Sequence, residues 1–150
     1  MKKNKETKVK TRTEKDTMGY VNVPSSALFG AQTQRAIDNF PISDNKFIFD
    51  FIKAVTIIKR SAAETNYKLD LLTKSQKESI LSATDKILNG ECNEHFPVDV
   101  FQTGSGTSTN MNVNEVISNI ANKFFAIKDT NKIHPNDHVN MGQSSNDVIP

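Results

Sequence analysis

The sequence predicts a mainly α-helical fold with one short extended segment near its N-terminus. Three stretches, 46–69, 73–90 and 111–127, repeat apolar residues every three or four positions, which is the period of a helix packed against a core. Only 18–24 alternates in the manner of a strand, around Val21 and Val23. A chain of 150 residues has the length of one ordinary domain with a real core.

The first two helices are predicted from N-cap residues and from apolar spacing. A short helix is expected to follow Pro24, because Ser25 and Ser26 are good N-cap residues, although Gly30 weakens its regularity. In 46–69, further apolar residues lie beside the main stripe, so we expect this helix to be covered on more than one side. The stripe expected to be buried is Phe47, Phe51, Ala54, Val55, Ile58, Ala62 and Thr65.

The later elements are predicted from caps and breakers. Thr73 and Gln76 form a capping-box pattern, and Gly90 stands where a C-terminal cap belongs. The next helix is expected to begin at Met111 or Asn112. The stretch 128–140 is predicted to be a loop, and 142–147 has the composition of another helix start.

Composition excludes several classes of protein. No apolar run is long enough to span a bilayer, so no membrane insertion is expected. The first 15 residues carry seven cations and two acids, and the net charge of +2 therefore leaves −3 on 16–150, which gives no basic surplus for nucleic acid. The one cysteine, Cys92, excludes an internal disulfide and a cysteine-ligated cluster and fits a cytoplasmic protein. Residues 1–11 are expected to form a disordered basic tail.

A first candidate binding site lies in 103–115, where two glycines and many hydroxyl and amide side chains precede a strongly periodic helix. A helix start offers N–H groups and a positive dipole end to an anion, and Ser105, Thr107, Ser108 and Asn110 can donate to it. No Lys or Arg occurs from 101 to 122, so a small carboxylate suits the stretch better than a polyphosphate. A flexible linker with a good N-cap remains the alternative.

A second polar stretch, 134–147, also lacks Lys and Arg and ends in Ser144, Ser145 and Asn146. The two stretches together could hold the two ends of a dicarboxylate. His134 and His138 have the spacing of zinc ligands on a helix, but Pro135 and the loop composition disfavour that geometry, so no metal is expected.

The strings 104–115 (GSGTSTNMNVNE) and 133–147 (IHPNDHVNMGQSSND) closely resemble signature regions of class II fumarases in the fumarase/aspartase superfamily. Upstream, 12–19 and 30–35 match the pattern of that family in order and spacing, as do Val23 and Pro24. The resemblance implies that 12–140 is the N-terminal helical domain of the fumarase/aspartase fold, and that 141–150 begins a central helical bundle.

The resemblance also implies a function: reversible hydration of fumarate to (S)-malate in the tricarboxylic acid cycle, by a homotetramer without a cofactor. The residues that it assigns to substrate binding are Ser105, Gly106, Thr107, Ser144, Ser145 and Asn146. Those that it assigns to a secondary dicarboxylate site are His134, Pro135, Asn136 and Asp137. The catalytic histidine and serine are implied to lie beyond residue 150, so we expect residues 1–150 alone to be inactive.

Two other functions remain open. Aspartate ammonia-lyase shares the fold and much of the first string, but His134 before Pro135 favours a fumarase, because known aspartases carry asparagine there. A non-catalytic helical scaffold or oligomerisation module would also explain the broad apolar stretch 46–69 and the missing catalytic segments.

Overall fold

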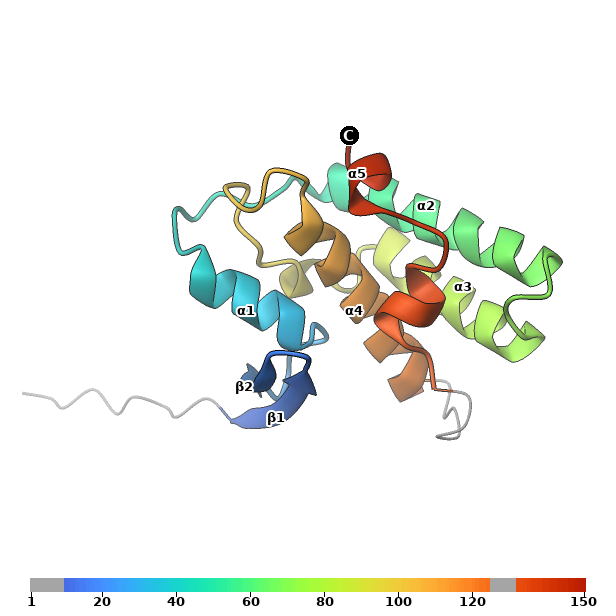
Figure 1. The fold of residues 1–150 in the computed structure, drawn as a ribbon, viewed down its shortest axis with the longest axis horizontal. Coiled ribbons are helices and arrows are strands. Elements are labelled where there is room, and N and C mark those ends of the chain that lie inside the picture. Colours follow the sequence, from blue (N-terminus) through green and yellow to red (C-terminus); the bar gives the residue numbers. More distant parts are fainter. Residues whose placement is uncertain (1–9, 125–131) are drawn as a thin grey trace, which may run out of the picture.

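A computed structural model describes residues 10–124 and 132–150 and confirms the mainly α-helical fold with a short β segment (Figure 1). The hairpin and helix α1 lie on one side of the central helix α4, and α2 and α3 lie on the other (Figure 1). Within the described residues, no helix combines the length and apolarity needed to cross a membrane.

The β segment is an antiparallel hairpin of β1 (Thr11–Asp16) and β2 (Gly19–Pro24). Strand β2 confirms the predicted extended segment. Strand β1 was not predicted, because its half-buried positions carry Arg12, Glu14 and Asp16 rather than apolar residues. It begins at Thr11, inside the stretch predicted to be a tail, whose residues 1–9 lie outside the described residues.

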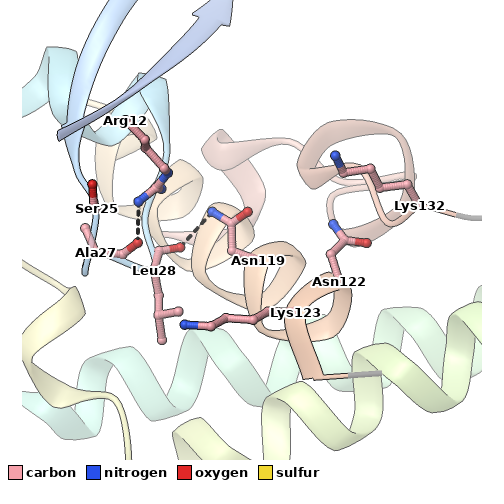
Figure 2. A pocket seen from close by; sticks show the side chains of 8 residues that line it. All are labelled: Arg12, Ser25, Ala27, Leu28, Asn119, Asn122, Lys123 and Lys132. Atoms are coloured by element: carbon pink, nitrogen blue, oxygen red, sulfur yellow. Dashed lines mark hydrogen bonds between the residues drawn. The ribbon is translucent and has the colours of Figure 1, made fainter. Parts of the chain in front are cut away.

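Helix α1 (Ala31–Asn39) begins well after the start predicted from Ser25 and Ser26. The guanidinium of Arg12 holds the preceding segment in a turn by donating to the carbonyls of Pro24 and Ala27, each at 2.8 Å, and of Phe29 at 2.7 Å. Figure 2 shows the bond to Ala27. Because one side chain gathers these three carbonyls, the prediction of a helix directly after Pro24 is wrong.

Helix α2 (Phe49–Lys68) buries a different face from the predicted one. Of the predicted stripe only Val55 is fully buried, and Ile57 and Ile58 are 51% and 39% exposed. Its inward face includes three polar residues, two of which, Lys59 and Asn66, bind residues outside the helix. That face is Ile52, Val55, Thr56, Lys59, Ala63 and Asn66.

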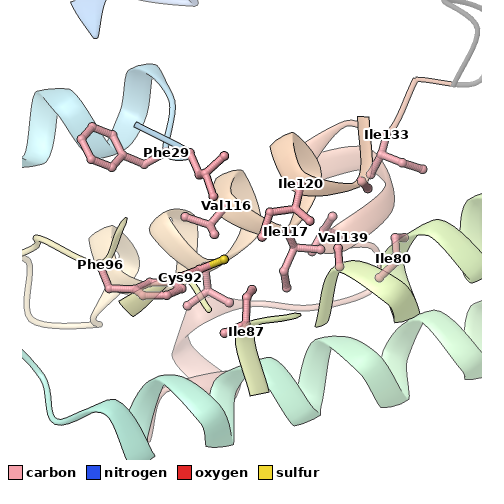
Figure 3. Close-up of a cluster of buried hydrophobic side chains, with 14 of the residues drawn as sticks. Phe29, Ile80, Ile87, Cys92, Phe96, Val116, Ile117, Ile120, Ile133 and Val139 are labelled. Atoms are coloured by element: carbon pink, nitrogen blue, oxygen red, sulfur yellow. The ribbon is translucent and has the colours of Figure 1, made fainter. Parts of the chain in front are cut away.

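Helix α3 (Lys74–Leu88) confirms its predicted caps. The Thr73 hydroxyl accepts a bond from the Gln76 amide at 3.2 Å, and the Gln76 side chain accepts one from the Thr73 amide at 2.9 Å. Gly90 follows the helix with φ of +82°, a left-handed conformation that suits glycine. Ile80 and Ile87 are fully buried beneath α4 (Figure 3).

Helix α4 (Thr107–Phe124) forms the centre of the core (Figure 3) and begins four to five residues before the predicted start at Met111 or Asn112. Its start is fixed from outside the helix, since the Gln102 side chain accepts a bond from the Thr109 amide at 2.9 Å. Val113, Val116 and Ile120 are fully buried, as periodicity predicted. The predicted end near Ile127 lies outside the described residues.

The C-terminal part holds two short helical turns. A π-helical turn, η3 (Pro135–Val139), occupies part of the predicted loop, because proline is compatible with a first helical position and the His134 ring caps the Asp137 amide at 3.2 Å. Positions 128–131 of that loop lie outside the described residues. Helix α5 (Ser145–Val148) confirms the predicted helix start.

Candidate active site

The structure brings the two donor-rich stretches together at one cluster of hydroxyl groups. The Thr107 Oγ1 lies 2.8 Å from the Ser105 Oγ and 3.0 Å from the Ser145 Oγ. Thr107 is exposed and the two serines are half-buried, so a solute can reach these groups. We call Ser105, Thr107 and Ser145 the hydroxyl cluster.

Gly106 allows the two stretches to approach each other. Its φ of +65° is left-handed, and a Cβ atom there would lie 2.5 Å from the Ile149 side chain, just after α5. A larger residue would strain the turn and push α5 away from the first turn of α4. The glycine therefore belongs to the site through its backbone.

Ser144 and Asn146 flank the cluster at the start of α5. The Ser144 hydroxyl accepts a bond from the Asn146 amide at 3.2 Å and so serves as the N-cap of this turn. Both residues are exposed. The side chains of Ser144, Ser145 and Asn146 thus stand on one short turn that faces the start of α4.

Lys59 of α2, which was not predicted as a site residue, lies beneath both stretches. It is fully buried, and its Nζ donates to the side-chain oxygens of Asn110 at 2.6 Å, Asn140 at 2.9 Å and Gln143 at 2.9 Å. Burial lowers the pKa of Lys59 to about 8. Its helical spacing from Val55 and Ala63 was the signal in the sequence that could have placed it on the inward face.

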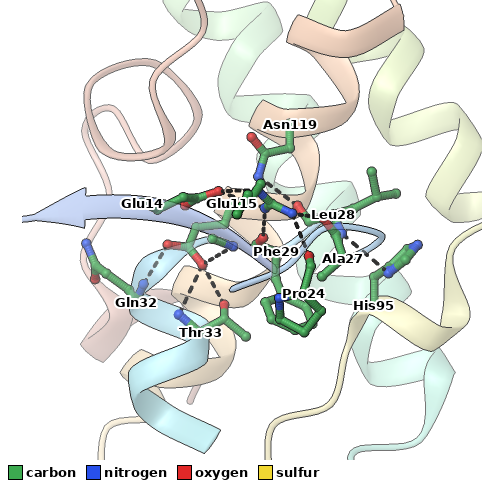
Figure 4. A network of polar contacts seen from close by, with 12 residues as sticks. Glu14, Pro24, Ala27, Leu28, Phe29, Gln32, Thr33, His95, Glu115 and Asn119 are labelled. Atoms are coloured by element: carbon green, nitrogen blue, oxygen red, sulfur yellow. Dashed lines mark hydrogen bonds and ion pairs between the residues drawn. The ribbon is translucent and has the colours of Figure 1, made fainter. Parts of the chain in front are cut away.

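Glu115 of α4 is a second buried charge, and it anchors the start of α1 (Figure 4). Its carboxylate accepts bonds from the amides of Gly30 at 2.9 Å, Gln32 at 2.9 Å and Thr33 at 3.0 Å, and from the Thr33 hydroxyl at 2.6 Å. These are the unpaired N–H groups of a helix start, where negative charge is favoured. Glu115 therefore has a structural role within the described residues.

The residues predicted for the secondary site lie apart from the hydroxyl cluster, around η3. His134, Pro135 and Asn136 line a hollow of about 550 Å³ that also borders β1, α1 and α4. The His134 Nδ1 accepts a bond from the Asp137 amide and lies 3.2 Å from the Asp137 carboxylate. Both contacts lie within η3 and its first flanking residue, and they orient the exposed His134 ring beside the hollow.

His138 packs between η3 and α3. Its Nδ1 accepts a bond from the backbone amide of His134 at 2.7 Å, and its Nε2 lies 3.1 Å from the side-chain Nε2 of Gln76. Burial lowers the pKa of His138. Among the described residues, no group of three or more His, Cys, Asp or Glu side chains is placed to hold a metal ion.

A further hollow, of about 440 Å³, lies between the 25–28 turn and the later part of α4 (Figure 2). Arg12, Lys123 and Lys132 contribute cations to its lining. No residue predicted for either site lines it, and the Arg12 guanidinium is used by the carbonyls of the turn.

The described domain is mainly helical and places hydroxyl donors at two neighbouring helix starts, those of α4 and α5. A family model described as lyase matches residues 19–150, and the chain belongs to this family. It is 52% identical over 140 residues to a class II fumarate hydratase of Halobacterium salinarum and 54% identical over 139 residues to that of Xylella fastidiosa. Each match covers 93% of this chain, and 30% and 28% of the relative.

Solved structures agree with these relatives. The class II fumarase from Schistosoma mansoni superimposes with a TM-score of 0.89 at 39% identity, over 94% of this chain and 30% of the other. A fumarate lyase:delta crystallin from Brucella melitensis gives 0.88 at 46% identity, over 94% and 34%. The resemblance to class II fumarases is confirmed, and the chain spans about 30% of the length of the curated relatives it matches.

Proposed function

We propose that this chain is the N-terminal, substrate-holding part of a fumarate hydratase, which adds water reversibly to fumarate and forms (S)-malate. The observation that carries the proposal is the hydroxyl cluster, in which Thr107 contacts both Ser105 and Ser145, the latter 38 residues away in sequence. Relatives named class II fumarate hydratase, about 50% identical over most of the chain, support it.

The chemistry of the site suits this reaction. Water addition across fumarate builds extra negative charge on one carboxylate of the substrate, and neutral donors held in advance stabilise that charge without reorganising. The hydroxyl groups of Ser105, Thr107 and Ser145 supply such donors, and Ser144 and Asn146 flank them. A cation is not needed to bind a carboxylate that accepts several directed hydrogen bonds.

Proton transfer needs groups other than the hydroxyl cluster, because a hydroxyl without a paired base is a weak base. In this proposal, a histidine and a serine elsewhere in the enzyme supply that chemistry, and a homotetramer in the cytoplasm assembles the complete site without a cofactor. The hollow beside His134, Pro135 and Asn136, where the His134 ring accepts a bond from the Asp137 amide, serves as the secondary dicarboxylate site.

The direct test is an assay of the protein encoded by the complete open reading frame that contains this chain. Fumarate, malate and aspartate are supplied separately, and fumarate absorbance and ammonia are followed. We expect fumarate and malate to interconvert without ammonia release. Ammonia from aspartate would assign the protein to the aspartases, and inactivity on all three would favour a scaffold.

A further inference from the structure

We propose that Lys59 is a positioning residue whose buried ammonium group fixes the two substrate-holding stretches, 105–110 and 140–146, relative to each other. The effect of Lys59 on turnover rests on the proposed function, whereas its effect on the relative position of the two stretches does not. Three independent segments meet at this one nitrogen: α2 provides it, α4 provides Asn110, and the turn before α5 provides Asn140 and Gln143.

In the first stretch, Lys59 binds a residue about one helical turn after Thr107. It binds the Asn110 side chain, and the Asn110 amide closes the first turn of α4 by donating to the Gly106 carbonyl at 3.1 Å. Asn110 is itself buried. A shift of its side chain therefore moves the turn that carries the Thr107 hydroxyl.

On the second stretch, Lys59 holds the turn that leads directly to Ser144. The Gln143 amide donates to the Asn140 carbonyl at 3.1 Å, and the Gln143 side chain donates back to the Val139 carbonyl at 3.0 Å. A bond of 3.1 Å from the Asn110 side chain to the Asn140 side chain links the two stretches directly. The ammonium thus completes a bridge from the start of α4 to the start of α5.

The charge state of Lys59 matters because an ammonium has three N–H donors and meets three acceptors. A neutral amine has two donors, so one amide oxygen would lose its partner and the bridge would loosen. Four ionisable groups of neighbouring elements bind residues other than Lys59. Asp85 of α3 pairs with Arg60, Glu115 of α4 binds α1, and the His138 and Asp137 of η3 contact Gln76 and His134.

The first experiment compares Lys59→Met with Lys68→Met in the protein from the complete open reading frame. Methionine keeps much of the length and removes the charge, and Lys68 is an exposed lysine of the same helix. We expect Lys59→Met to lower kcat for fumarate about 100-fold, because misplaced donors cost about that much. Hydrogen exchange should rise in 105–110 and 140–146 together. Lys68→Met should change neither.

The second measurement is the pH dependence of kcat, which a merely structural lysine would not set. Wild-type kcat should fall as the pH rises past about 8, where burial places the pKa of Lys59. Asn140→Ala removes one acceptor from the ammonium and should move this fall to lower pH. These two profiles also test the proposal if Lys59→Met does not fold.

Three results would overturn the inference: unchanged exchange in both stretches of a folded Lys59→Met, unchanged kcat in that variant, or an alkaline fall of kcat at the same pH in Asn140→Ala as in the wild type. If the wild type does not act on fumarate, the proposed function fails by itself. The exchange comparison then still decides whether Lys59 holds the two stretches.

Discussion

Two buried charged side chains, Lys59 and Glu115, organise the polar part of this core. Each has a set of partners that matches its chemistry: three acceptors for the ammonium, and four donors for the two carboxylate oxygens. A buried charge is costly unless its hydrogen bonds are satisfied, so these partners explain why both residues point inward. One residue fixes the candidate site, and the other fixes α1.

At His134, the exposed position beside a separate hollow predicts a small effect on chemistry. We expect His134→Asn to keep kcat within about twofold of wild type, which is less than about 1 kcal/mol in the barrier. Dicarboxylate binding outside the active centre should weaken, as measured by calorimetry alongside steady-state kinetics. A loss of kcat as severe as that of a hydroxyl-cluster variant would show that His134 belongs to the reaction.

At the scale of elements, α1 depends on a residue 82 to 85 positions away in sequence. Glu115→Gln replaces one accepting oxygen by a donor and leaves a buried amide of α1 without its partner, which costs about 1 to 3 kcal/mol. Hydrogen exchange of 30–36 should therefore rise about tenfold or more. Glu78→Gln, the same change at an exposed site of α3, is the control. Equal exchange in the two variants would contradict this role of Glu115.

Elements defined by local signals were predictable from sequence, and elements defined by distant partners were not. The capping box at Thr73 and the apolar period of α4 identified their helices. The predicted inward face of α2 was wrong, because that prediction counted only apolar residues. Lys59 and Asn66 face inward since they bind partners about 50 to 80 residues away in sequence. The start of α1 was misplaced because Arg12 and Glu115 determine it.

The hydroxyl groups of the candidate site were predictable from sequence, but the buried lysine beneath them was not. Resemblance and donor-rich composition pointed to Ser105, Thr107 and Ser145, and the structure places these hydroxyl groups within bonding distance. Lys59 was missed, because a single lysine in an apolar stretch is ordinarily a solvated residue. Three-dimensional proximity alone shows that it joins the two stretches.

At the scale of the whole molecule, residues 1–150 by themselves should not hydrate fumarate at a rate above buffer. The hydroxyl cluster can hold a carboxylate, but within 10–124 and 132–150 its three hydroxyl groups have no hydrogen bond to a histidine, carboxylate or amine side chain. The measurement is the loss of fumarate absorbance with purified chain, with light scattering to give its mass. Malate formation that scales with chain concentration and survives further purification would contradict the prediction.

The claim that the hydroxyl cluster stabilises the reacting carboxylate is tested most directly by Thr107→Val in the protein from the complete open reading frame. Valine keeps the shape of threonine and removes the hydroxyl group that contacts both Ser105 and Ser145. The measurement is kcat for fumarate hydration, with light scattering to confirm an unchanged assembly. We expect kcat to fall by about 100- to 1,000-fold, or about 2.7 to 4 kcal/mol, as for other lost oxyanion donors. Near-normal turnover in an intact assembly would contradict the account.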